Sequence, residues 1–471
     1  MYDSNGVLTG HYDNQVDDYK QDHFQFHWTQ QYNSSWSSTI GLNYTYGRGY
    51  YEEYNDLWAT QNITFGDEVN FDYLQIAPLV IGGTTIDTTE NISRKWLDNN
   101  FYVGTFSLNY DSNQTNTVFG GSYSTYNGDH FGNLIWAQYA SNAAPNHRFY
   151  ENNADKKDFN LYTKVTQRLG TAWTVYADVQ FRTIAYNSLG TVKGPEPIAI
   201  DDNLSFFNPK AGITYRASEA SRLYLSYAKA QREPNRSDYE NGTPKPESLN
   251  DFEAGWRFKK EKVQLQANLY YMDYENQLVL TGALDAVGEP IRTNSGDSYR
   301  FGLEIEAAIQ FAEQWVWQPN LALSSNKNKD FYFKRDGQLQ NLGTTNISYS
   351  PNVVGASNLV FAPSTVFRVA LLSKYVGEQF MGNIDADLSK LEAYFTNDIN
   401  ISYVWTPNSW IKEAQFSLLV NNIFNALYTS NGYFYTFDDD YSVAGVVTTI
   451  EGVGYYPQAG TNFLMGATFR F

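Results

Sequence analysis

Apolar and polar residues alternate along most of the chain, and the pattern is clearest near the C-terminus. From Phe463 to Phe471 every second residue is apolar, and the residues between them are small or polar apart from Leu464. A period of two places successive side chains on opposite faces of a β-strand. The sequence therefore predicts a final strand with one apolar face, formed by Phe463, Met465, Ala467, Phe469 and Phe471.

The same alternation recurs upstream, in pairs of strands joined by short polar turns. The first predicted pair covers residues 19–30 and 36–46, around a turn at 33–35. Two polar stretches, 47–93 and 127–157, interrupt the pattern, and we interpret them as long loops. Counting the repeats gives about seventeen strands. Further turns are predicted at 111–113, 169–171, 217–220, 259–261, near 313, 362–364 and 406–409.

The two faces of these strands differ in chemistry. In residues 173–182, five apolar residues alternate with Thr, Tyr, Asp, Gln and Arg. A soluble sandwich would bury apolar faces against each other, without long loops confined to one rim. Short turns at one rim and long loops at the other are typical of outer-membrane barrels. The sequence thus predicts an all-β fold: a transmembrane antiparallel β-barrel with short periplasmic turns and long extracellular loops, in which residues 1–471 form one domain.

Composition supports this prediction and excludes other classes. Aromatic residues make up 17% of the chain, including 38 Tyr, which suits strands and interfacial girdles. Mean hydropathy is −0.49, and no apolar run approaches the ~20 residues of a membrane helix. The absence of Cys excludes disulfides and thiolate sites. A net charge of −18 argues against a nucleic-acid partner.

An ordered set of stretches carries a family resemblance. They are YDNQVDDYKQDHFQF (12–26), RKWLDNNF (94–101), FNPKAGITY (207–215), AKAQREPN (228–235), KPESLNDFEAGW (245–256), NLYYMDYENQLV (268–279), LVNNIFNALYTSNGY (419–433) and YPQAGTNFLMGATFRF (456–471). The set spans nearly the whole chain. It is similar to the barrel of TonB-dependent outer-membrane receptors, particularly the iron-siderophore type of Bacteroidetes-like bacteria.

The resemblance implies a larger protein than this chain. The family barrel has about 22 strands closed around an N-terminal plug, preceded by a short box that contacts the partner TonB. Neither plug nor box is seen here, and residues 1–30 contain no export signal. We therefore expect this chain to be the C-terminal portion of the barrel, without the plug and about the first five strands.

The resemblance also implies location, partners and cargo. The expected location is the bacterial outer membrane. Expected partners are outer-membrane lipid, the barrel assembly machinery, a small-molecule ligand, and the TonB complex through the N-terminal region that is not seen. No cofactor is expected, because the iron chelate that the receptor imports would be its cargo.

The candidate ligand site lies in the last long loop. Aromatic side chains there could clasp the planar groups of a siderophore, while carboxylates could alternatively hold Ca²⁺. A solvated loop whose aromatics pack on their neighbours is the competing interpretation. The candidate residues are Tyr433, Phe434, Tyr435, Phe437, Asp438, Asp439, Asp440 and Tyr441.

Two further sets of residues have expected roles in the barrel. Charged residues on the polar strand faces are predicted to line the lumen, pairing with one another or with a plug: Asp178, Arg182, Arg257, Arg300, Glu304, Glu306 and Arg368. The terminal strand resembles an outer-membrane sorting signal, whose expected residues are Phe463, Met465, Phe469 and Phe471.

No catalytic or metal-binding constellation emerges from the sequence. The nearest histidines, His23 and His27, would lie on one strand face roughly 13 Å apart, too far to share a metal ion. We therefore expect a receptor that binds and imports a ligand without breaking a bond. Alternatives are a passive porin or surface adhesin, a barrel enzyme, or uptake of haem, cobalamin or a glycan.

Overall fold

The computed structural model describes residues 1–471 except 65, 285–289 and 408–409. The described chain divides into two compact units. Unit 1 comprises Met1–Val165 and Asp178–Phe207, and unit 2 comprises Thr166–Ala177 and Asn208–Phe471. Both units are built mainly from long β-strands, as the alternating sequence predicts.

In unit 1, neighbouring strands follow chain order. β1 pairs with β2, β2 with β5, and β5 with β6, always antiparallel. Four residues separate β1 from β2, whereas β2 and β5 are separated by residues 56–90. The strands are β1 (Val16–Gln31), β2 (Trp36–Asn55), β5 (Asn91–Asp111), β6 (Thr115–Ala137), and parts of β7 (His147–Leu169), β8 (Trp173–Val192) and β9 (Glu196–Arg216).

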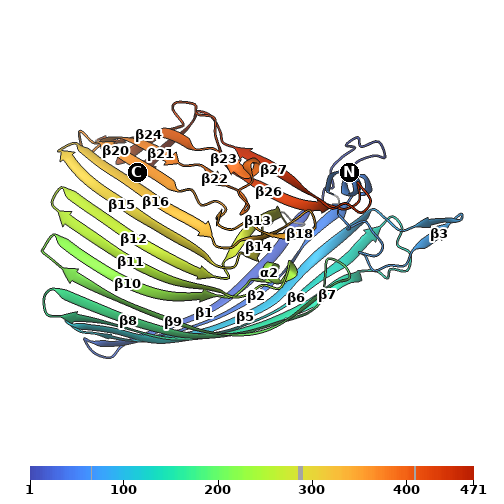
Figure 1. Ribbon diagram of the computed structural model, residues 1–471, viewed down its shortest axis with the longest axis horizontal. Coiled ribbons are helices and arrows are strands. Elements are labelled where there is room, and N and C mark those ends of the chain that lie inside the picture. The colour runs from blue at the N-terminus through green and yellow to red at the C-terminus, as the bar shows by residue number, and fades with distance from the viewer. Residues whose placement is uncertain (65, 285–289, 408–409) are drawn as a thin grey trace. The chain divides into compact units, whose positions relative to one another are not determined.

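Unit 2 continues with the same hairpin plan. Figure 1 shows its middle strands side by side, and each pair is antiparallel. From β9 onward the pairing follows chain order to β28, the last strand. The strands are β10 (Ser221–Arg232), β11 (Glu247–Lys260), β12 (Val263–Glu275), β15 (Ser298–Ala312), β16 (Trp315–Asn328), β20 (Val353–Phe361), β21 (Phe367–Val376), β24 (Tyr394–Trp405), β25 (Glu413–Asn421) and β28 (Asn462–Arg470).

Eighteen strands of the described chain belong to one sheet, and one of these, β19 (Thr345–Asn346), has only two residues. The other seventeen match the predicted number. Shorter elements lie in the loops: α1 (Leu57–Ala59), η1 (Thr60–Thr64), β3 (Leu79–Ile81), β4 (Thr84–Ile86), α2 (Arg236–Glu240), β13 (Leu278–Leu284), β14 (Pro290–Asn294), β17 (Tyr332–Arg335), β18 (Gln338–Asn341), β22 (Gln379–Phe380), η2 (Asp387–Ser389), β23 (Lys390–Leu391), β26 (Thr429–Asp439) and β27 (Thr448–Pro457).

The predicted turns that lie wholly within the described residues are confirmed, but two predicted loops are partly strand. Most of 127–157 belongs to β6 and β7, and β2 and β5 extend into both ends of 47–93. In these extensions both faces carry polar residues, so apolar alternation ends while backbone pairing continues. The turn predicted at 406–409 includes residues 408–409, which lie outside the described part of the chain.

The register keeps apolar and polar side chains on separate faces of the sheet. In unit 2, one directly paired row is apolar: Leu225, Ala254, Leu269, Leu303 and Leu323. The adjacent row on the other face is mainly polar: Tyr224, Gly255, Asn268 and Glu304. A sheet with lipid on one side and water or protein on the other needs this separation.

On the polar face, tyrosine rings lie flat over glycines of the next strand. Tyr224 is directly opposite Gly255, and Tyr270 is opposite Gly302. A Cβ built on Gly255 would come within 2.2 Å of the Tyr224 ring, and one on Gly302 within 2.4 Å of Tyr270. Only glycine leaves room for the ring at these positions. Similar pairs join Tyr162 to Gly120 and Tyr176 to Gly212.

Several tryptophans lie near the short-turn ends of the strands, where interfacial anchors are expected, whereas Trp96 and Trp136 lie towards the long-loop ends of β5 and β6. In unit 1, the ring centroid of Trp36 is 4.9 Å from that of Tyr110. In unit 2, Trp173 lies 4.4 Å from Tyr215. These rings mark the turn-side edge of the apolar band in each unit.

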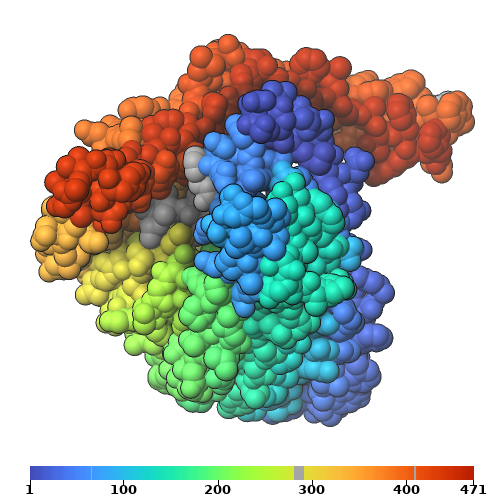
Figure 2. Space-filling view, turned by 90° about the vertical axis from the view of Figure 1, so that its right-hand side faces the viewer, coloured from blue at the N-terminus to red at the C-terminus, as the bar shows by residue number. Residues whose placement is uncertain are grey.

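The densest cores of the described chain lie in the loops. In unit 1, Phe71, Leu74 and Ile76 of loop 56–90 pack against Leu134 of β6 and Phe149 of β7. Figure 2 shows this light-blue loop lying against the teal ends of those strands. Among the described residues, no helix is both long and apolar enough to cross a membrane.

Candidate ligand-binding site

The last long loop forms a hairpin, β26 and β27, within unit 2. Direct pairing runs from Asn431 opposite Tyr456 to Asp439 opposite Thr448. Because successive side chains alternate, the hairpin has two different faces. One face packs against neighbouring loops, and the other carries a row of aromatic rings.

The packed face is anchored by Phe434. Its side chain is 1% exposed and forms a buried cluster with Met381 and Leu391 of the loop between β21 and β24. The Tyr349 hydroxyl donates a hydrogen bond to the Gly432 carbonyl over 2.6 Å. The sequence placed Phe434 among the ligand contacts, but its even position turns it towards the loops. It is an anchor of the hairpin, with almost no surface to offer a ligand.

A second hairpin, β17–β18, braces the same face. Arg335 Nη2 lies 2.7 Å from Glu451 Oε1. The Asp336 amide donates to Thr449 Oγ1 over 2.7 Å, and the Thr449 amide donates to Asp336 Oδ1 over 2.8 Å. A single ion pair on an exposed surface contributes little to stability. Together, however, these contacts hold the tip of one hairpin against the other. The two loops therefore form one connected assembly.

The other face of β26 carries a stacked aromatic row. The ring centroids of Tyr433 and Tyr435 are 6.3 Å apart, and those of Tyr435 and Phe437 are 6.4 Å apart, with planes within 21° of parallel. Gly454 and Gly452 lie directly opposite the two tyrosines. A Cβ on either glycine would approach the opposing ring to 2.3 Å or less. The glycines thus let the rings lie flat across the hairpin.

This aromatic row remains accessible. Tyr435 is 38% exposed and Phe437 43%. Tyr456 of β27 extends the row, with its ring 5.9 Å from Tyr433. Sequence reasoning missed Tyr456 and the two glycines. The available signal was the spacing: aromatic residues at every second position of one strand, opposite glycines at every second position of the next.

The three consecutive aspartates have different surroundings. Asp438 accepts a hydrogen bond from Thr449 Oγ1 over 3.0 Å and lies 3.2 Å from Lys334 Nζ, and these contacts lower the pKa of its carboxyl. Asp439 turns into the hairpin bend and accepts from the Ser442 amide over 3.0 Å. Bonds from the side chain and backbone of Ser442 lower the pKa of Asp439.

The remaining candidates of the loop are exposed. Asp440 lies on the surface, and Tyr441 is 76% exposed beyond the end of β26. Asp438 pairs with Lys334, and Asp439 accepts a hydrogen bond in the hairpin bend. The three carboxylates therefore do not converge on one point. Among the described residues, no group of three or more His, Cys, Asp or Glu is arranged to hold a metal ion. The Ca²⁺ alternative therefore gains no support.

The predicted lumen charges lie on the polar strand faces. Arg182 Nη2 is 2.6 Å from Asp158 Oδ2, and Arg182 Nε also donates to that carboxylate. Arg300 donates to the Ser350 hydroxyl over 3.2 Å. These contacts brace neighbouring strands and loops, consistent with structural roles. The other predicted residues are Asp178, which is half-buried, and the exposed Arg257, Glu304, Glu306 and Arg368.

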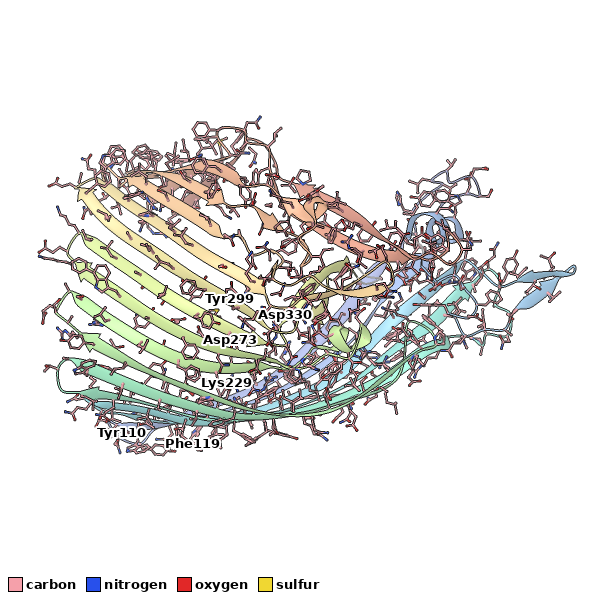
Figure 3. The ribbon with its side chains drawn as sticks, in the orientation of Figure 1. Tyr110, Phe119, Lys229, Asp273, Tyr299 and Asp330 are labelled. Atoms are coloured by element: carbon pink, nitrogen blue, oxygen red, sulfur yellow. The ribbon has the colours of Figure 1, made fainter. Side chains whose placement is uncertain are left out.

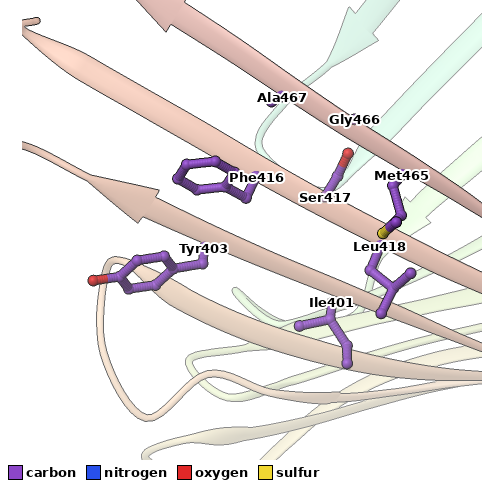
Figure 4. Close-up of a pocket in the computed structure, with 8 residues that line it drawn as sticks. All are labelled: Ile401, Tyr403, Phe416, Ser417, Leu418, Met465, Gly466 and Ala467. Carbon is purple, nitrogen blue, oxygen red and sulfur yellow. The ribbon is translucent and has the colours of Figure 1, made fainter.

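The residues of the expected sorting signal lie on β28. Phe463, Met465 and Phe469 are 67%, 75% and 47% exposed, all on one face. Next to Met465, the small Ala467 leaves a hollow of about 380 Å³ on the apolar surface of β24, β25 and β28 (Figure 4). The terminal Phe471 stacks on Trp410 at 5.2 Å. Their role in assembly stays a prediction.

Comparison with known proteins now identifies the family. A family model described as TonB dependent receptor-like, beta-barrel, matches residues 2–423. The chain belongs to this family. It therefore has the transmembrane antiparallel β-barrel fold predicted from the strand pattern.

One curated relative is the catecholate siderophore receptor Fiu of Escherichia coli K12. It is 22% identical over 302 residues, which cover 60% of this chain and 35% of Fiu. The chain thus spans about a third of the length of the curated relatives that it matches.

Solved structures of siderophore receptors have the same fold. The closed form of Fiu from E. coli K12 matches with a TM-score of 0.63 at 16% identity, over 97% of this chain and 64% of Fiu. The ferric yersiniabactin receptor FyuA from Yersinia pestis gives 0.59 at 13%, over 99% and 64%. The siderophore receptor PiuA from Acinetobacter baumannii gives 0.62 at 14%, over 97% and 65%.

Proposed function

We propose that this chain is the barrel part of an outer-membrane receptor that captures a ferric siderophore and, in the complete protein, imports it with energy from TonB. The family match supports a TonB-dependent receptor. Relatives named as catecholate or siderophore receptors support the cargo. The proposal includes the outer membrane as location and the barrel assembly machinery as a partner.

The observation that carries the proposal is the exposed aromatic row of β26, held on a braced hairpin. Planar rings of a ligand stack favourably on Tyr or Phe at centroid distances of roughly 4.5–7 Å. Burial of Phe434 and the contacts of Asp336 with Thr449 keep this row in place before a ligand arrives. A preordered row loses less conformational entropy on binding than a mobile loop would.

Two cations beside the hairpin are already paired on its packed face. Lys334 and Arg335 of β17 pair with Asp438 and Glu451 near the tip of the hairpin, on the face opposite the aromatic row, so the proposal rests on the rings and not on these charges. Binding and passage of the chelate require no bond to be broken. The function is therefore transport, with loop capture as its first step.

Removal of two rings from the row tests the proposal. Tyr433→Ala combined with Tyr435→Ala should weaken binding of a ferric catecholate about 10- to 100-fold, because each aromatic contact is worth about 0.5–1.5 kcal/mol beyond the surface that it buries. Binding is measured on purified receptor by quenching of intrinsic fluorescence. Tyr332→Ala, which removes an exposed ring of β17, is the matched control.

Equal binding by the double variant and the Tyr332 control would remove the aromatic row from the site. The cargo needs a separate measurement in cells. A strain without the receptor gene should grow poorly on ferric catecholate as sole iron source and normally on haem. Unchanged growth on the siderophore would contradict the iron proposal and direct attention to haem, cobalamin or glycan uptake.

A further inference from the structure

Tyr349 has a backbone conformation that a bulky residue rarely adopts. It lies in the turn between β19 and β20 of unit 2, with a φ of +50°. Among the described residues with a positive φ, it is the only aromatic one. This left-handed region is costly for a residue with a large side chain, and such strain persists only where surrounding contacts hold it. The contacts of Tyr349 therefore show what its conformation is used for.

One set of contacts joins this turn to the loop between β21 and β24. The Tyr349 amide donates to the Phe380 carbonyl over 2.8 Å. Its half-buried ring packs against the cluster that contains Phe434. Just before it in the chain, the Ser348 amide donates to Asn383 Oδ1 over 3.0 Å. The turn is thus fixed on the side where the hairpin β26–β27 has its buried anchor.

A second contact joins Tyr349 to β26 itself. Its hydroxyl donates to the carbonyl of Gly432, which directly precedes Tyr433, the first ring of the aromatic row. A Cβ on Gly432 would come within 2.4 Å of the Gly454 carbonyl oxygen and within 2.7 Å of Met381 Sδ. The strand therefore passes through a tight gap at this point. Within that gap, the hydrogen bond from Tyr349 sets where the aromatic row begins.

The same turn is also joined to the polar face of the main sheet. Arg300 of β15 donates from Nη1 to the Ser350 hydroxyl over 3.2 Å, and this hydroxyl donates to the Ser348 carbonyl over 3.1 Å. Ser348 and Ser350 are the two chain neighbours of Tyr349, so these bonds close the turn around it. Hydrogen bonds and one short piece of backbone thus connect the main sheet to the hairpin that carries the aromatic row.

We propose that Tyr349 and Arg300 are positioning residues of the ligand site. Tyr349 holds β26 where Tyr433 and Tyr435 can stack on the ligand, and Arg300 holds the turn that places the Tyr349 hydroxyl. Arg300 acts through this turn and makes no contact with the ligand. The inference rests on the proposed function, because it takes the aromatic row as the ligand site.

The strain explains why a distant arginine matters for binding. Without the bond from Arg300, the turn is free to relax from its left-handed conformation, and the Tyr349 hydroxyl moves away from Gly432. The ligand must then restore the strained turn when it binds, so part of its binding free energy is lost. With the bond in place, the turn is already in the bound conformation.

The test measures binding of a ferric catecholate to the purified complete receptor by fluorescence quenching. Tyr349→Phe removes only the hydroxyl and should weaken binding about three- to tenfold, the effect of one hydrogen bond between neutral groups. Arg300→Met keeps the length of the side chain but removes the donor, and it should weaken binding by a similar factor. Arg300→Lys keeps a donor within reach of Ser350 and should restore binding to within about twofold of the unchanged protein.

Lys329→Gln is the matched control. Lys329 Nζ lies 2.7 Å from Asp273 Oδ1, and Asp273 is directly opposite Tyr299, the chain neighbour of Arg300. Figure 3 labels Asp273 and Tyr299 on these neighbouring strands. The variant removes an ion pair near Arg300 and leaves the hydrogen bonds of Tyr349 in place. Its binding should stay within about twofold of the unchanged protein.

A double variant separates positioning from direct contact with the ligand. If Arg300 acts through the turn, Tyr349→Phe combined with Arg300→Met should bind about as well as either single variant. Losses that multiply would mean that Arg300 touches the ligand itself, and this result would overturn the inference. Equal weakening by Arg300→Lys and Arg300→Met would overturn it as well, because the donor would not matter.

Failure of this inference can be told apart from failure of the proposed function. Normal binding by the variant with Tyr433→Ala and Tyr435→Ala would remove the aromatic row from the ligand site. Weakened binding by that variant, together with normal binding by Tyr349→Phe or Arg300→Met, would leave the row in place and overturn only the positioning role. The heat-dependent shift of each variant on gels checks that it is folded.

Discussion

At Gly255, on the polar face of the sheet, there is no room for a side chain larger than a hydrogen atom. The ring of Tyr224 lies across it, and the Tyr224 hydroxyl donates to Asn268 Oδ1 over 2.8 Å. The ring thus joins three consecutive strands, β10, β11 and β12, through one flat contact and one hydrogen bond. Comparable pairs at Tyr270, Tyr176 and Tyr162 make this a repeated way of joining strands on the face away from lipid.

Gly255→Ala should therefore destabilise the sheet. The added methyl would meet the Tyr224 ring at 2.2 Å, so the ring must turn away and lose its bond to Asn268. We expect a loss of about 1–3 kcal/mol in the free energy of unfolding, measured in urea with the protein in detergent or lipid. Gly355→Ala is the control, because its Cβ would find no atom closer than 3.7 Å. Equal losses for both variants would contradict this role of the ring.

Among the elements, the hairpin β26–β27 depends most on contacts outside the main sheet. A two-stranded hairpin is marginally stable alone in water. Contacts on its packed face supply the additional stability. They are the burial of Phe434 with Met381 and Leu391, and the contacts between β17 and β27. The order of the aromatic row on the opposite face is a consequence of this packing.

Phe434→Ala should free the hairpin while leaving the main sheet intact. Truncation of a buried Phe lowers stability by about 3–5 kcal/mol, and here the packed loops are the part that is destabilised. Amide hydrogen exchange within β26 and β27 should accelerate, with little change in the strands of the main sheet. Phe437→Ala, on the exposed face of the same strand, should leave exchange nearly unchanged but lower ligand affinity. Equal exchange in the two variants would argue against the anchor.

The sequence predicts the strands well wherever lipid imposes a pattern on them. Turns such as 33–35 and 111–113 can be predicted from the alternation alone, because the apolar residues of the flanking strands must all lie on the face towards lipid. The extensions of β6 and β7 could not be predicted, since polar residues occur on both of their faces and the apolar alternation ends there. The same limit applied in the last loop, where eight neighbouring residues were grouped as one site. The strand pairing of the hairpin places these residues on two different faces. Phe434 is buried among neighbouring loops, and Asp438 pairs with Lys334, which is distant in sequence.

For the whole molecule, the chain has the fold of its relatives over nearly its full length, yet covers 64% of the solved Fiu chain. The strand pattern and the loop hairpin are properties of this chain, while energised import is proposed for the complete protein. Capture and transport can therefore be tested separately. Binding to purified protein tests the loops, and growth tests the complete receptor.

We expect the last strand to matter most for assembly in the membrane. β28 pairs with β25 through nine directly opposite residues, and Phe471 follows it to stack on Trp410. Arg470 Nη1 also lies 3.1 Å from Glu413 Oε1, which joins the end of β28 to the start of β25. These contacts hold the terminal residues in place at the short-turn end of β25 and β28.

Deletion of Phe471 in the complete receptor should lower its level in the outer membrane several-fold and leave the ligand affinity of the assembled fraction unchanged. The removed ring belongs to the expected sorting signal and lies at the opposite end of unit 2 from the aromatic row of β26. Trp410→Ala separates the two possible causes, because it removes the stacking partner but keeps the terminal aromatic residue. If both changes lower the level equally, the stacked pair matters through stability; if only the deletion does, the terminal residue is recognised during assembly. Normal levels after deletion would remove the sorting role from Phe471.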